Sequence, residues 1–301
     1  MRTAAVVVTW EGGLTTERCV DSLRAQHAPP DEIIVVDNAS SPAERVRLEQ
    51  AVAARPGVRL LALDANRQFA GGLNAGARAA FAAGADRVLL LNNDTVLAPE
   101  ALARLGTALD AFPTAGIAGP LVRDLGTPGR VLSAGERHVL PLLCVPRTLL
   151  RHRQRGRGPY LVSGVMGCAM LVTRACFEAV GGFDEGIGVY YEDVDFCVAA
   201  RASGFEAVVE PAAVVYHDGL RGFARGLTPW AAYLKARNPW LLLRRRGGAA
   251  SWLTFLPTYA ALVLTSAALY AVRGRVDVAR ALVRGVAAGL GATDDPPPRR
   301  A

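Results

Sequence analysis

The chain has 301 residues, a length sufficient for one large α/β domain with an appendage or for two small domains. Hydrophobic residues make up 51% of it. A composition this apolar excludes disorder for most of the chain, because it can bury a sizeable core. The formal net charge of +7 suits nucleic acid, anionic lipid or phosphorylated ligands without choosing among them, since arginine is scattered through the whole chain.

The first half alternates apolar, β-branched runs with segments of helical spacing. Strands are expected at residues 4–9, 32–37, 58–63 and 87–91, and helices at 15–26, 42–54, 71–83 and 99–111. Continuous apolar strands separated by helices predict a parallel sheet with both faces covered.

The second half has a less regular pattern. Residues 122–159 lack clear periodicity and carry many Gly, Pro and Arg residues. Beyond them the pattern predicts a strand at 161–173, a short helix at 177–180, a helix at 192–202 and a strand at 212–216. We therefore expect a mixed region built onto the parallel half.

Residues 249–272 form a run without a charged side chain. About 20 apolar residues span a bilayer. However, Pro257 interrupts the run, and basic residues flank it on both sides, so it shows no positive-inside asymmetry. The preferred interpretation is a helical hairpin at the membrane surface, anchored by Trp240 and Trp252. A buried helix ranks second and a true span third, and the tail from Thr293 is expected to be disordered.

Polar residues follow three of the predicted strands, at the edge where a parallel sheet binds its ligands. They are Thr9, Trp10 and Glu11, then Asp37 and Asn38, then Asn92, Asn93 and Asp94. A carboxylate here can accept a hydrogen bond from a base or a ribose, or hold Mg²⁺ or Mn²⁺ near a diphosphate. Any single acid is also explained as a helix cap or a turn residue, which is a fair interpretation of Asp37. Three clusters on one edge favour a ligand site.

A glycine-rich stretch, NRQFAGGLNAG, runs from Asn66 into the third predicted helix. It is not a P-loop, because no Gly-Lys-Ser/Thr follows, and it is not a dinucleotide fingerprint, because it follows the third strand and lacks GxGxxG. Gly71 and Gly72 would let the backbone approach an anion at a helix N-terminus, and Arg67 adds a positive charge. The alternative is a tight turn with close packing of the helix on a strand.

Acidic residues gather around the start of the helix predicted at 192–202. A base that takes a proton from a hydroxyl group needs a carboxylate within hydrogen-bond reach, and Asp193 is the best placed. The dipole of the helix accounts for Glu192 and Asp195 without any catalytic role. His217 ends the last predicted strand, where metal or diphosphate binding and a structural role are about equally good interpretations.

Seven motifs carry a family resemblance: VVVTW, VVDNASS, NRQFAGGLNAG, LLLNND, GGFDE, YYEDVDFCVAARASGF and VVYH. In this order they resemble the family 2 glycosyltransferases with the GT-A fold, an α/β fold with a mostly parallel central sheet and helices on both faces. The likeness runs from about residue 4 to about residue 220. It is greatest to bacterial rhamnosyltransferase-type members that build cell-wall or O-antigen polysaccharide.

The resemblance implies an organisation into regions. A GT-A glycosyltransferase domain would occupy 1–225, with a nucleotide-sugar-binding half at 1–120 and an acceptor or catalytic half at 121–225. A helical, membrane-associating region would follow at 226–292, and a disordered tail at 293–301.

The resemblance also implies residue roles. The nucleotide-sugar-binding set comprises Thr9, Trp10, Glu11, Asp37, Asn38, Asn66, Arg67, Gly71, Gly72, Asn74, Asn92 and Asn93. Asp94 stands where the family keeps the last acid of its DxD motif and would bind Mg²⁺ or Mn²⁺ on the donor diphosphate, with His217 reaching the metal or the leaving group. Asp193 matches the catalytic aspartate, and Glu192 would position the acceptor.

Two departures from the family pattern stand out. The first strand ends Thr-Trp-Glu, where the family more often has Thr-Tyr-Asn, so base contacts through Trp10 and Glu11 do not carry over directly. The equivalent of the DxD motif is Asn92-Asn93-Asp94, with one carboxylate instead of two. This lowers the ligand charge and predicts modest metal affinity.

The implied activity is sugar transfer with inversion in a single displacement. The implied donor is dTDP-rhamnose, with UDP-galactofuranose, UDP-galactose and UDP-N-acetylglucosamine as alternatives. The acceptor would be a glycan or a polyprenyl-diphosphate-linked glycan at the cytoplasmic leaflet. An anionic membrane surface is an expected partner, since arginines from Arg147 to Arg157 would meet lipid phosphates, although a solvated loop explains them equally well. Whether the chain forms a homo-oligomer stays open.

Cysteine usage and the start of the chain bear on localisation. The five cysteines contain no CxxC pair, which argues against a zinc site and a disulfide framework. No secretory signal is expected before a strand that begins at Ala4. We therefore expect a cytoplasmic protein, peripheral on the inner face of the plasma membrane.

Three other functional classes compete with a transferase. A catalytically inactive nucleotide-sugar-binding module would need the acids lost, and both Asp94 and Asp193 are present. An integral membrane protein with a regulatory cytosolic domain is the second. Nucleic acid is not an expected partner, because the basic residues are not interleaved with aromatic ones.

Overall fold

The computed structural model describes residues 1–136, 158–218 and 227–291. The chain forms two compact units. Within the described ranges, the first comprises 1–136, 158–188 and 192–218, and the second comprises 189–191 and 227–291. The arginines predicted to meet lipid phosphates lie outside the described residues.

The first unit is built on one sheet. Its described strands are β1 (Thr3–Thr9), β2 (Glu32–Asp37), β3 (Val58–Ala62), β4 (Arg87–Asn92), β5 (Thr95–Leu97), β6 (Ala115–Asp124), β7 (Val131–Ser133), β8 (Tyr160–Val162), β9 (Ala169–Thr173) and β10 (Glu206–His217). The order is β3-β2-β1-β4-β9-β6-β10-β5, with β7 on β6 and β8 on β10. Strands β1 to β4 pair in parallel, as do β6 and β10, and the other pairings are antiparallel. The predicted α/β fold with a central sheet is confirmed; the sheet is parallel from β1 to β4, as expected for the first half, and mixed beyond it.

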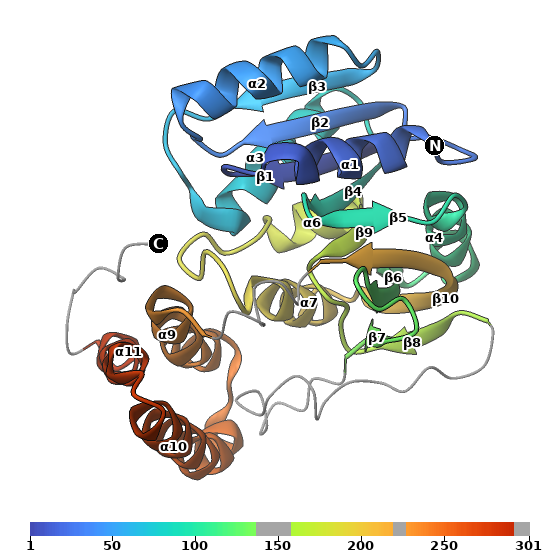
Figure 1. The fold of residues 1–301 in the computed structure, drawn as a ribbon. Coiled ribbons are helices and arrows are strands. Elements are labelled where there is room, and N and C mark those ends of the chain that lie inside the picture. The colour runs from blue at the N-terminus through green and yellow to red at the C-terminus, as the bar shows by residue number, and fades with distance from the viewer. Residues whose placement is uncertain (137–157, 219–226, 292–301) are drawn as a thin grey trace. The chain divides into compact units, whose positions relative to one another are not determined.

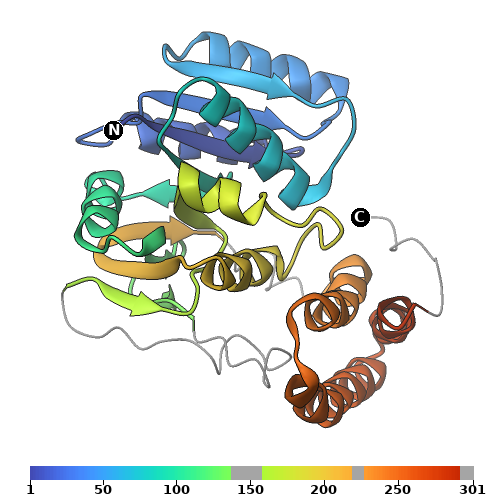
Figure 2. The same cartoon turned by 180° about the vertical axis from the view of Figure 1, so that it is seen from behind.

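Helices cover both faces of this sheet (Figures 1 and 2). One face carries α3 (Gln68–Ala82), α6 (Arg174–Val180) and α7 (Glu192–Ala202), and the other carries α1 (Gly13–Arg24), α2 (Pro42–Ala53) and α4 (Ala101–Ala111). Neighbouring residues of β1 alternate between the two cores, Val6 on the side of α3 and Val7 on the side of α1. Because both faces are buried, the central strands β1, β2 and β4 carry continuous apolar runs.

Local chemistry places the helix ends in the first unit. The Ser41 hydroxyl accepts a hydrogen bond from the Glu44 N–H group at the start of α2, and Pro42 occupies the first turn, where its missing N–H costs nothing. Helix α6 ends at Gly181, whose φ of 84° lies in the left-handed region that glycine tolerates. All eight elements predicted for the first half are present, and α4 begins at Ala101, two residues later than predicted.

The single strand predicted at 161–173 is wrong. The chain forms β8 and β9 instead, which pair with different partners, β10 for the first and β4 and β6 for the second. The apolar run continues between them because Val165 packs into the core. Gly164 and Gly167 mark the break, as glycines within an apparent strand often do.

Strands β6 and β7 are absent from the prediction, and β10 is longer than predicted. Almost every residue of β6 is buried, so it shows no alternation, and its glycines and proline weaken the strand signal. Strand β10 begins at Glu206 and changes register on β6 between Glu210 and Val214. The irregularity surrounds Pro211, which has no N–H to donate to the ladder.

The second unit is helical in its described part. It contains α9 (Pro229–Arg246), α10 (Ala249–Val272) and α11 (Val276–Gly289). Helices α9 and α11 approach closely, since a Cβ atom added at Gly285 would lie 2.3 Å from the carbonyl oxygen of Tyr233. Trp240 packs edge-on against Phe255 and Tyr259, with ring centroids 5.1 and 5.2 Å away. It is only 6% exposed, so its predicted role as a membrane anchor is wrong.

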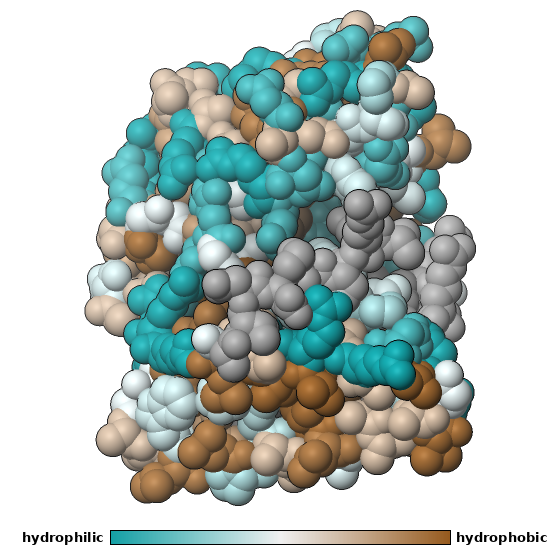
Figure 3. Space-filling view, turned by 90° about the vertical axis from the view of Figure 1, so that its left-hand side faces the viewer, coloured by the Kyte–Doolittle hydropathy of each residue, from teal (hydrophilic) through white to brown (hydrophobic). Residues whose placement is uncertain are grey.

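Helix α10 coincides with the predicted charge-free run and buries little of its surface. Three of its residues, Ser251, Phe255 and Tyr259, are buried, whereas Leu253 and Leu264 are 78% and 69% exposed. Figure 3 shows apolar residues gathered on this part of the surface. Of the described helices, α10 alone is long and apolar enough to cross a membrane, judged by length and composition. This exposure argues against the buried-helix alternative.

Candidate active site

The carboxyl ends of β1, β2 and β4 meet at one edge of the sheet. Thr9 lies opposite Asp37 in the register of β1 and β2, and Val8 lies opposite Asn92 in that of β1 and β4. Three polar clusters that are far apart in the sequence are therefore neighbours, as expected from the strand pattern. Their contacts with a ligand stay predictions.

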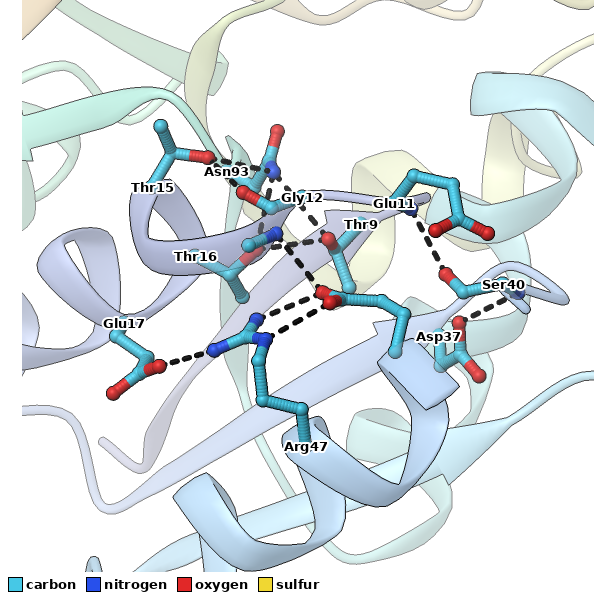
Figure 4. Close-up of polar contacts among 12 residues, drawn as sticks. Thr9, Glu11, Gly12, Thr15, Thr16, Glu17, Asp37, Ser40, Arg47 and Asn93 are labelled. Atoms are coloured by element: carbon cyan, nitrogen blue, oxygen red, sulfur yellow. Dashed lines mark hydrogen bonds and ion pairs between the residues drawn. The ribbon is translucent and has the colours of Figure 1, made fainter. Parts of the chain in front are cut away.

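A cluster of hydroxyl and amide groups joins the first of these strand ends to the third (Figure 4). The Oγ1 atoms of Thr9 and Thr16 are 2.8 Å apart, and the Asn93 amide donates to both, at 3.3 and 3.1 Å. A Cβ atom added at Gly12 would lie 2.2 Å from both the Thr9 hydroxyl and the Asn93 amide. Glycine at this position thus lets the loop after β1 close over the cluster.

Glu11 ties the loop after β1 to the loop after β2. Its N–H group donates to the Ser40 hydroxyl at 3.0 Å, and its carboxylate accepts hydrogen bonds from the backbone and the hydroxyl of Ser41. Glu11 adopts a φ of 51°, in the left-handed region. Trp10, directly before it, is partly exposed. These bonds tie together the two loops that form the edge of the predicted nucleoside site.

Asp37 is fully buried and has protein partners at both carboxylate oxygens. Arg45 donates from Nε at 2.8 Å, and the Ser40 N–H group donates at 3.0 Å. Arg45 also donates to the carbonyl oxygen of Leu63 at 2.8 Å. These contacts match the turn-residue interpretation of Asp37. Sequence reasoning missed Arg45, because no motif distinguishes it from Arg47, the other arginine of α2.

Asn38 holds the loop that enters α3. Its amide nitrogen donates to the Asn66 side chain at 3.2 Å and to the Gln68 carbonyl at 2.7 Å, and its oxygen accepts from the Arg67 N–H group at 2.9 Å. The Asn66 oxygen in turn accepts from the Gln68 N–H group at 2.9 Å. The predicted diphosphate loop is thereby connected to the predicted nucleoside edge.

The charged side chain of this loop is paired. Arg67 Nη2 lies 2.8 Å from both carboxylate oxygens of Glu185, and the Asn74 amide donates to the same carboxylate at 3.0 Å. Burial raises the pKa of Glu185, but the hydrogen bonds from Asn74 and Arg67 and the charges of Arg67 and Arg78 outweigh it and bring the pKa below its usual value. Glu185 is a further residue that sequence reasoning missed, although it lies in the GGFDE motif.

Asn74 is only 1% exposed and pairs in both directions with the backbone of Phe183. Its amide nitrogen donates to the Phe183 carbonyl at 2.9 Å, and its oxygen accepts from the Phe183 N–H group at 2.8 Å. These bonds attach the GGFDE segment to α3. Contact of Asn74 with a nucleotide sugar stays a prediction, while the contacts seen are structural.

Two glycines of α3, Gly72 and Gly76, lie where the helix meets the sheet, whereas Gly71 faces the side chains of Arg67 and Glu185. A Cβ atom added at Gly72 would lie 2.6 Å from a methyl of Val8, and one added at Gly76 would lie 2.3 Å from a methyl of Val6. Both distances are too short for any side chain. This observation supports the close-packing interpretation of the glycine-rich stretch.

Asp94 and His217 meet where β4 and β10 end. The Oδ1 atom of Asp94 is 3.2 Å from Nε2 of His217, and the Asn92 amide is 3.3 Å from the same ring nitrogen. Burial alone would raise the pKa of Asp94, but the hydrogen bond and charge of His217 outweigh burial and lower the pKa. The two residues proposed for the metal are thus brought together, from positions far apart in the sequence.

This donor set fits one kind of metal site. Asp94 and His217 offer one carboxylate and one imidazole, and among the described residues no three His, Cys, Asp or Glu side chains gather closely enough to hold an ion. Mg²⁺ and Mn²⁺ accept a small number of protein ligands when diphosphate oxygens and water complete the coordination. The pair therefore fits a cation that is bound together with the donor, not one held in a protein cage.

Asp193 lies in the first turn of α7 and is only 2% exposed. Its carboxylate accepts hydrogen bonds from the Gly167 N–H group at 2.7 Å and the Val194 N–H group at 2.9 Å. A Cβ atom added at Gly167 would lie 2.8 Å from the Cβ of Asp193, so glycine permits this approach. Glu192, directly before Asp193, is also buried.

A continuous path of bonds joins Asp193 to the predicted metal end. Gly167 donates to Asp193 and is followed by Cys168, whose carbonyl accepts from the Asn92 N–H group at 3.0 Å. The side chain of Asn92 contacts His217. The predicted base and the predicted metal residues therefore belong to one edge of the same sheet.

Comparisons with known proteins agree on one family and one fold. The model of the glycosyltransferase-like family 2 matches residues 2–242. Over 254 residues, the chain is 31% identical to an N-acetylglucosaminyl-diphospho-decaprenol L-rhamnosyltransferase of Mycobacterium tuberculosis, covering 77% of this chain and 80% of that protein. It is 25% identical to the dTDP-rhamnosyl transferase RfbF of Shigella flexneri, covering 80% and 79%. The mannosyltransferase PcManGT from Pyrobaculum calidifontis, in complex with GDP-Man and Mn²⁺, has a TM-score of 0.60 at 20% identity, covering 96% and 87%.

Proposed function

Because the chain belongs to the family 2 glycosyltransferases, we propose that it transfers rhamnose from dTDP-rhamnose to a hydroxyl group of a polyprenyl-diphosphate-linked glycan. The observation that carries this proposal is the bonded path from Asp193 to His217 at the edge of the sheet. The names of the two rhamnosyltransferase relatives support the choice of donor. The diphospho-decaprenol in one of those names supports the acceptor.

Asp193 would act as the general base. It would take the proton of the acceptor hydroxyl, whose oxygen attacks the anomeric carbon from the face opposite the diphosphate. The new carbon–oxygen bond forms as the bond to the diphosphate breaks, and the nucleoside diphosphate leaves with the electron pair, so that the configuration inverts. The hydrogen bonds from Gly167 and Val194 hold the carboxylate in one orientation, which proton transfer at a defined atom requires.

The donor would occupy the edge formed by β1, β2 and β4. Asp94 and His217 would hold a divalent cation that offsets the charge growing on the departing diphosphate. The loop held by Asn38 would lie beside the diphosphate, and Trp10, which is partly exposed, would lie beside the base. With one carboxylate in the set, we expect metal binding to be modest in the absence of donor.

A transfer assay tests the proposal. Purified protein is given dTDP-rhamnose and a synthetic polyprenyl-diphosphate-linked N-acetylglucosamine, with Mg²⁺ or Mn²⁺, and the product linkage is examined by NMR. We expect transfer with inversion. Transfer from UDP-sugars but not from dTDP-rhamnose would show that the donor is a UDP-sugar. Binding of nucleotide sugars without transfer or hydrolysis would identify an inactive binding module.

The same proposal places the protein at the inner face of the plasma membrane through α10. The hydroxyls of Thr258 and Thr265 each donate to a carbonyl one turn earlier at 2.7 Å, so the helix satisfies them internally, as a helix in contact with lipid requires. The exposed Leu253 and Leu264 would enter the lipid, and Arg273 beyond the helix would meet lipid phosphates.

Co-sedimentation with anionic phospholipid vesicles tests this placement. We expect the wild type to bind and the double variant Leu253→Asp, Leu264→Asp to stay in solution. A Thr107→Asp variant, on the exposed side of α4, controls for the added negative charge. Carbonate extraction that leaves the protein in the membrane would instead indicate that α10 spans it.

A further inference from the structure

Three residues, Val189 to Tyr191, connect Gly188 to Glu192, the first residue of α7, which directly precedes Asp193. Their contacts place them in the second unit, although the chain on both sides belongs to the first. Tyr190 and Tyr191 have φ values of 64° and 73°. This left-handed conformation is unfavourable for large side chains and persists only where surrounding contacts impose it.

Asn238 of α9 supplies such contacts. Its side chain is completely buried, and its amide nitrogen donates to the carbonyl oxygens of Val189 and Tyr190, both at 2.8 Å. The amide oxygen accepts from Nε of Arg237 at 2.9 Å, which fixes the direction in which the nitrogen points. One amide thus holds two successive carbonyl groups in the segment before the catalytic helix.

The ring of Tyr190 is held by the same helix. It lies 5.9 Å from the ring of Trp230, and Nζ of Lys235 is 4.7 Å from its centre. On the other side of the segment, the carbonyl of Gly188 accepts from the Ala70 N–H group at 2.8 Å. Only three residues lie between Gly188 and α7, so the segment has little freedom to change without moving the start of that helix.

We propose that Asn238 is a positioning residue for the transfer reaction. It holds Tyr190 and Tyr191 in the left-handed conformation and so sets where the chain enters α7 and where Asp193 presents its carboxylate. The inference rests on the proposed role of Asp193 as general base. A general base tolerates little displacement, and a shift of about 1 Å costs on the order of a hundredfold in rate.

The variant Asn238→Asp tests this role, because it keeps the shape of the side chain and replaces the donating amide with an acceptor. The introduced carboxylate would face two carbonyl oxygens, so both hydrogen bonds are lost. We expect kcat to fall about tenfold or more, while the Kd for dTDP-rhamnose stays within about twofold of wild type, because the predicted donor residues lie on other strand ends.

Leu243→Ala is the matched control. Leu243 is also completely buried in α9, but it packs against Trp240, Phe255 and Tyr259, away from the 189–191 segment. We expect it to lower the melting temperature at least as much as Asn238→Asp and to leave kcat near wild type. An equal loss of kcat in both variants, or a normal kcat in Asn238→Asp, would overturn the positioning role.

Hydrogen exchange separates this inference from the proposed function. Peptides covering 186–196 should exchange their amide hydrogens about tenfold faster in Asn238→Asp than in wild type. In Leu243→Ala their exchange rate should equal that of wild type. If the wild type transfers no sugar, the proposed function fails on its own, and the exchange measurement still decides whether Asn238 holds the segment. Unchanged exchange in Asn238→Asp would refute the inference even in an active enzyme.

Discussion

Replacing Asn74 by alanine distinguishes a structural role for this residue from contact with the donor. Asn74 is 1% exposed and satisfies both the N–H and the carbonyl group of Phe183, which is itself buried. Each hydrogen bond contributes about 1 kcal/mol net, and a buried group left without a partner costs about 1–3 kcal/mol more. We therefore expect the free energy of unfolding to fall by about 3 kcal/mol.

For a unit of this size, that loss corresponds to a melting temperature about 6–12 °C lower. Differential scanning calorimetry measures the shift, and isothermal titration with dTDP-rhamnose below the transition measures donor affinity. Asn74→Asp is a second variant: it keeps an acceptor for the Phe183 N–H group but places a buried carboxylate against the Phe183 carbonyl and the Glu185 carboxylate, so it should lower the melting temperature at least as much as alanine. An unchanged melting temperature with donor affinity reduced tenfold would refute the structural role and assign Asn74 to the nucleotide sugar.

Four further variants test the metal residues, the Glu185 ion pair and the packing of α3 on the sheet. Asp94→Ala and His217→Ala should each abolish the dependence of donor binding on Mg²⁺ or Mn²⁺ in titrations, and unchanged metal dependence would contradict the metal assignment. Glu185 has a pKa below its usual 4.5, so its stabilisation is present above pH 4.5 and is lost as the pH falls through the lower folded value; Glu185→Gln should unfold more easily at pH 7 and match wild type in acid. In Gly76→Ala, the better helix propensity of alanine gains about 1 kcal/mol, but overlap with Val6 costs about 1–3 kcal/mol, so urea unfolding should show a net loss.

The first half of the fold is predictable because local and global signals agree there. Buried strands such as β2, at 32–37, are bounded by turn residues, and Ser41 and Pro42 mark the start of the next helix. The strand predicted at 161–173 fails because an apolar run does not reveal whether its residues pair with one neighbour or two. Only the glycines within it, of which Gly167 contacts Asp193, pointed to the break.

Part of the candidate site was likewise predictable from the sequence and part was not. Motif order located Asp94, His217 and Asp193, and the structure places them on one edge of the sheet. Periodicity does not show that Asp37 pairs with Arg45, because it does not fix how α2 packs beside the end of β2. Nor does it show that Asn74 pairs with Phe183, because that pair depends on how segments more than 100 residues apart pack. The role of Asn238 could not be predicted for the same reason, because it contacts residues nearly 50 positions earlier in the chain.

The role of Asp193 as general base is tested most directly by Asp193→Asn. The amide preserves the shape of the side chain but does not accept the proton of the acceptor hydroxyl. Single-turnover transfer from dTDP-rhamnose should fall by about 10²–10⁴-fold, while titration shows donor binding at wild-type affinity. Transfer at a near-normal rate in this variant would contradict the assignment of the base and, with it, the proposed mechanism.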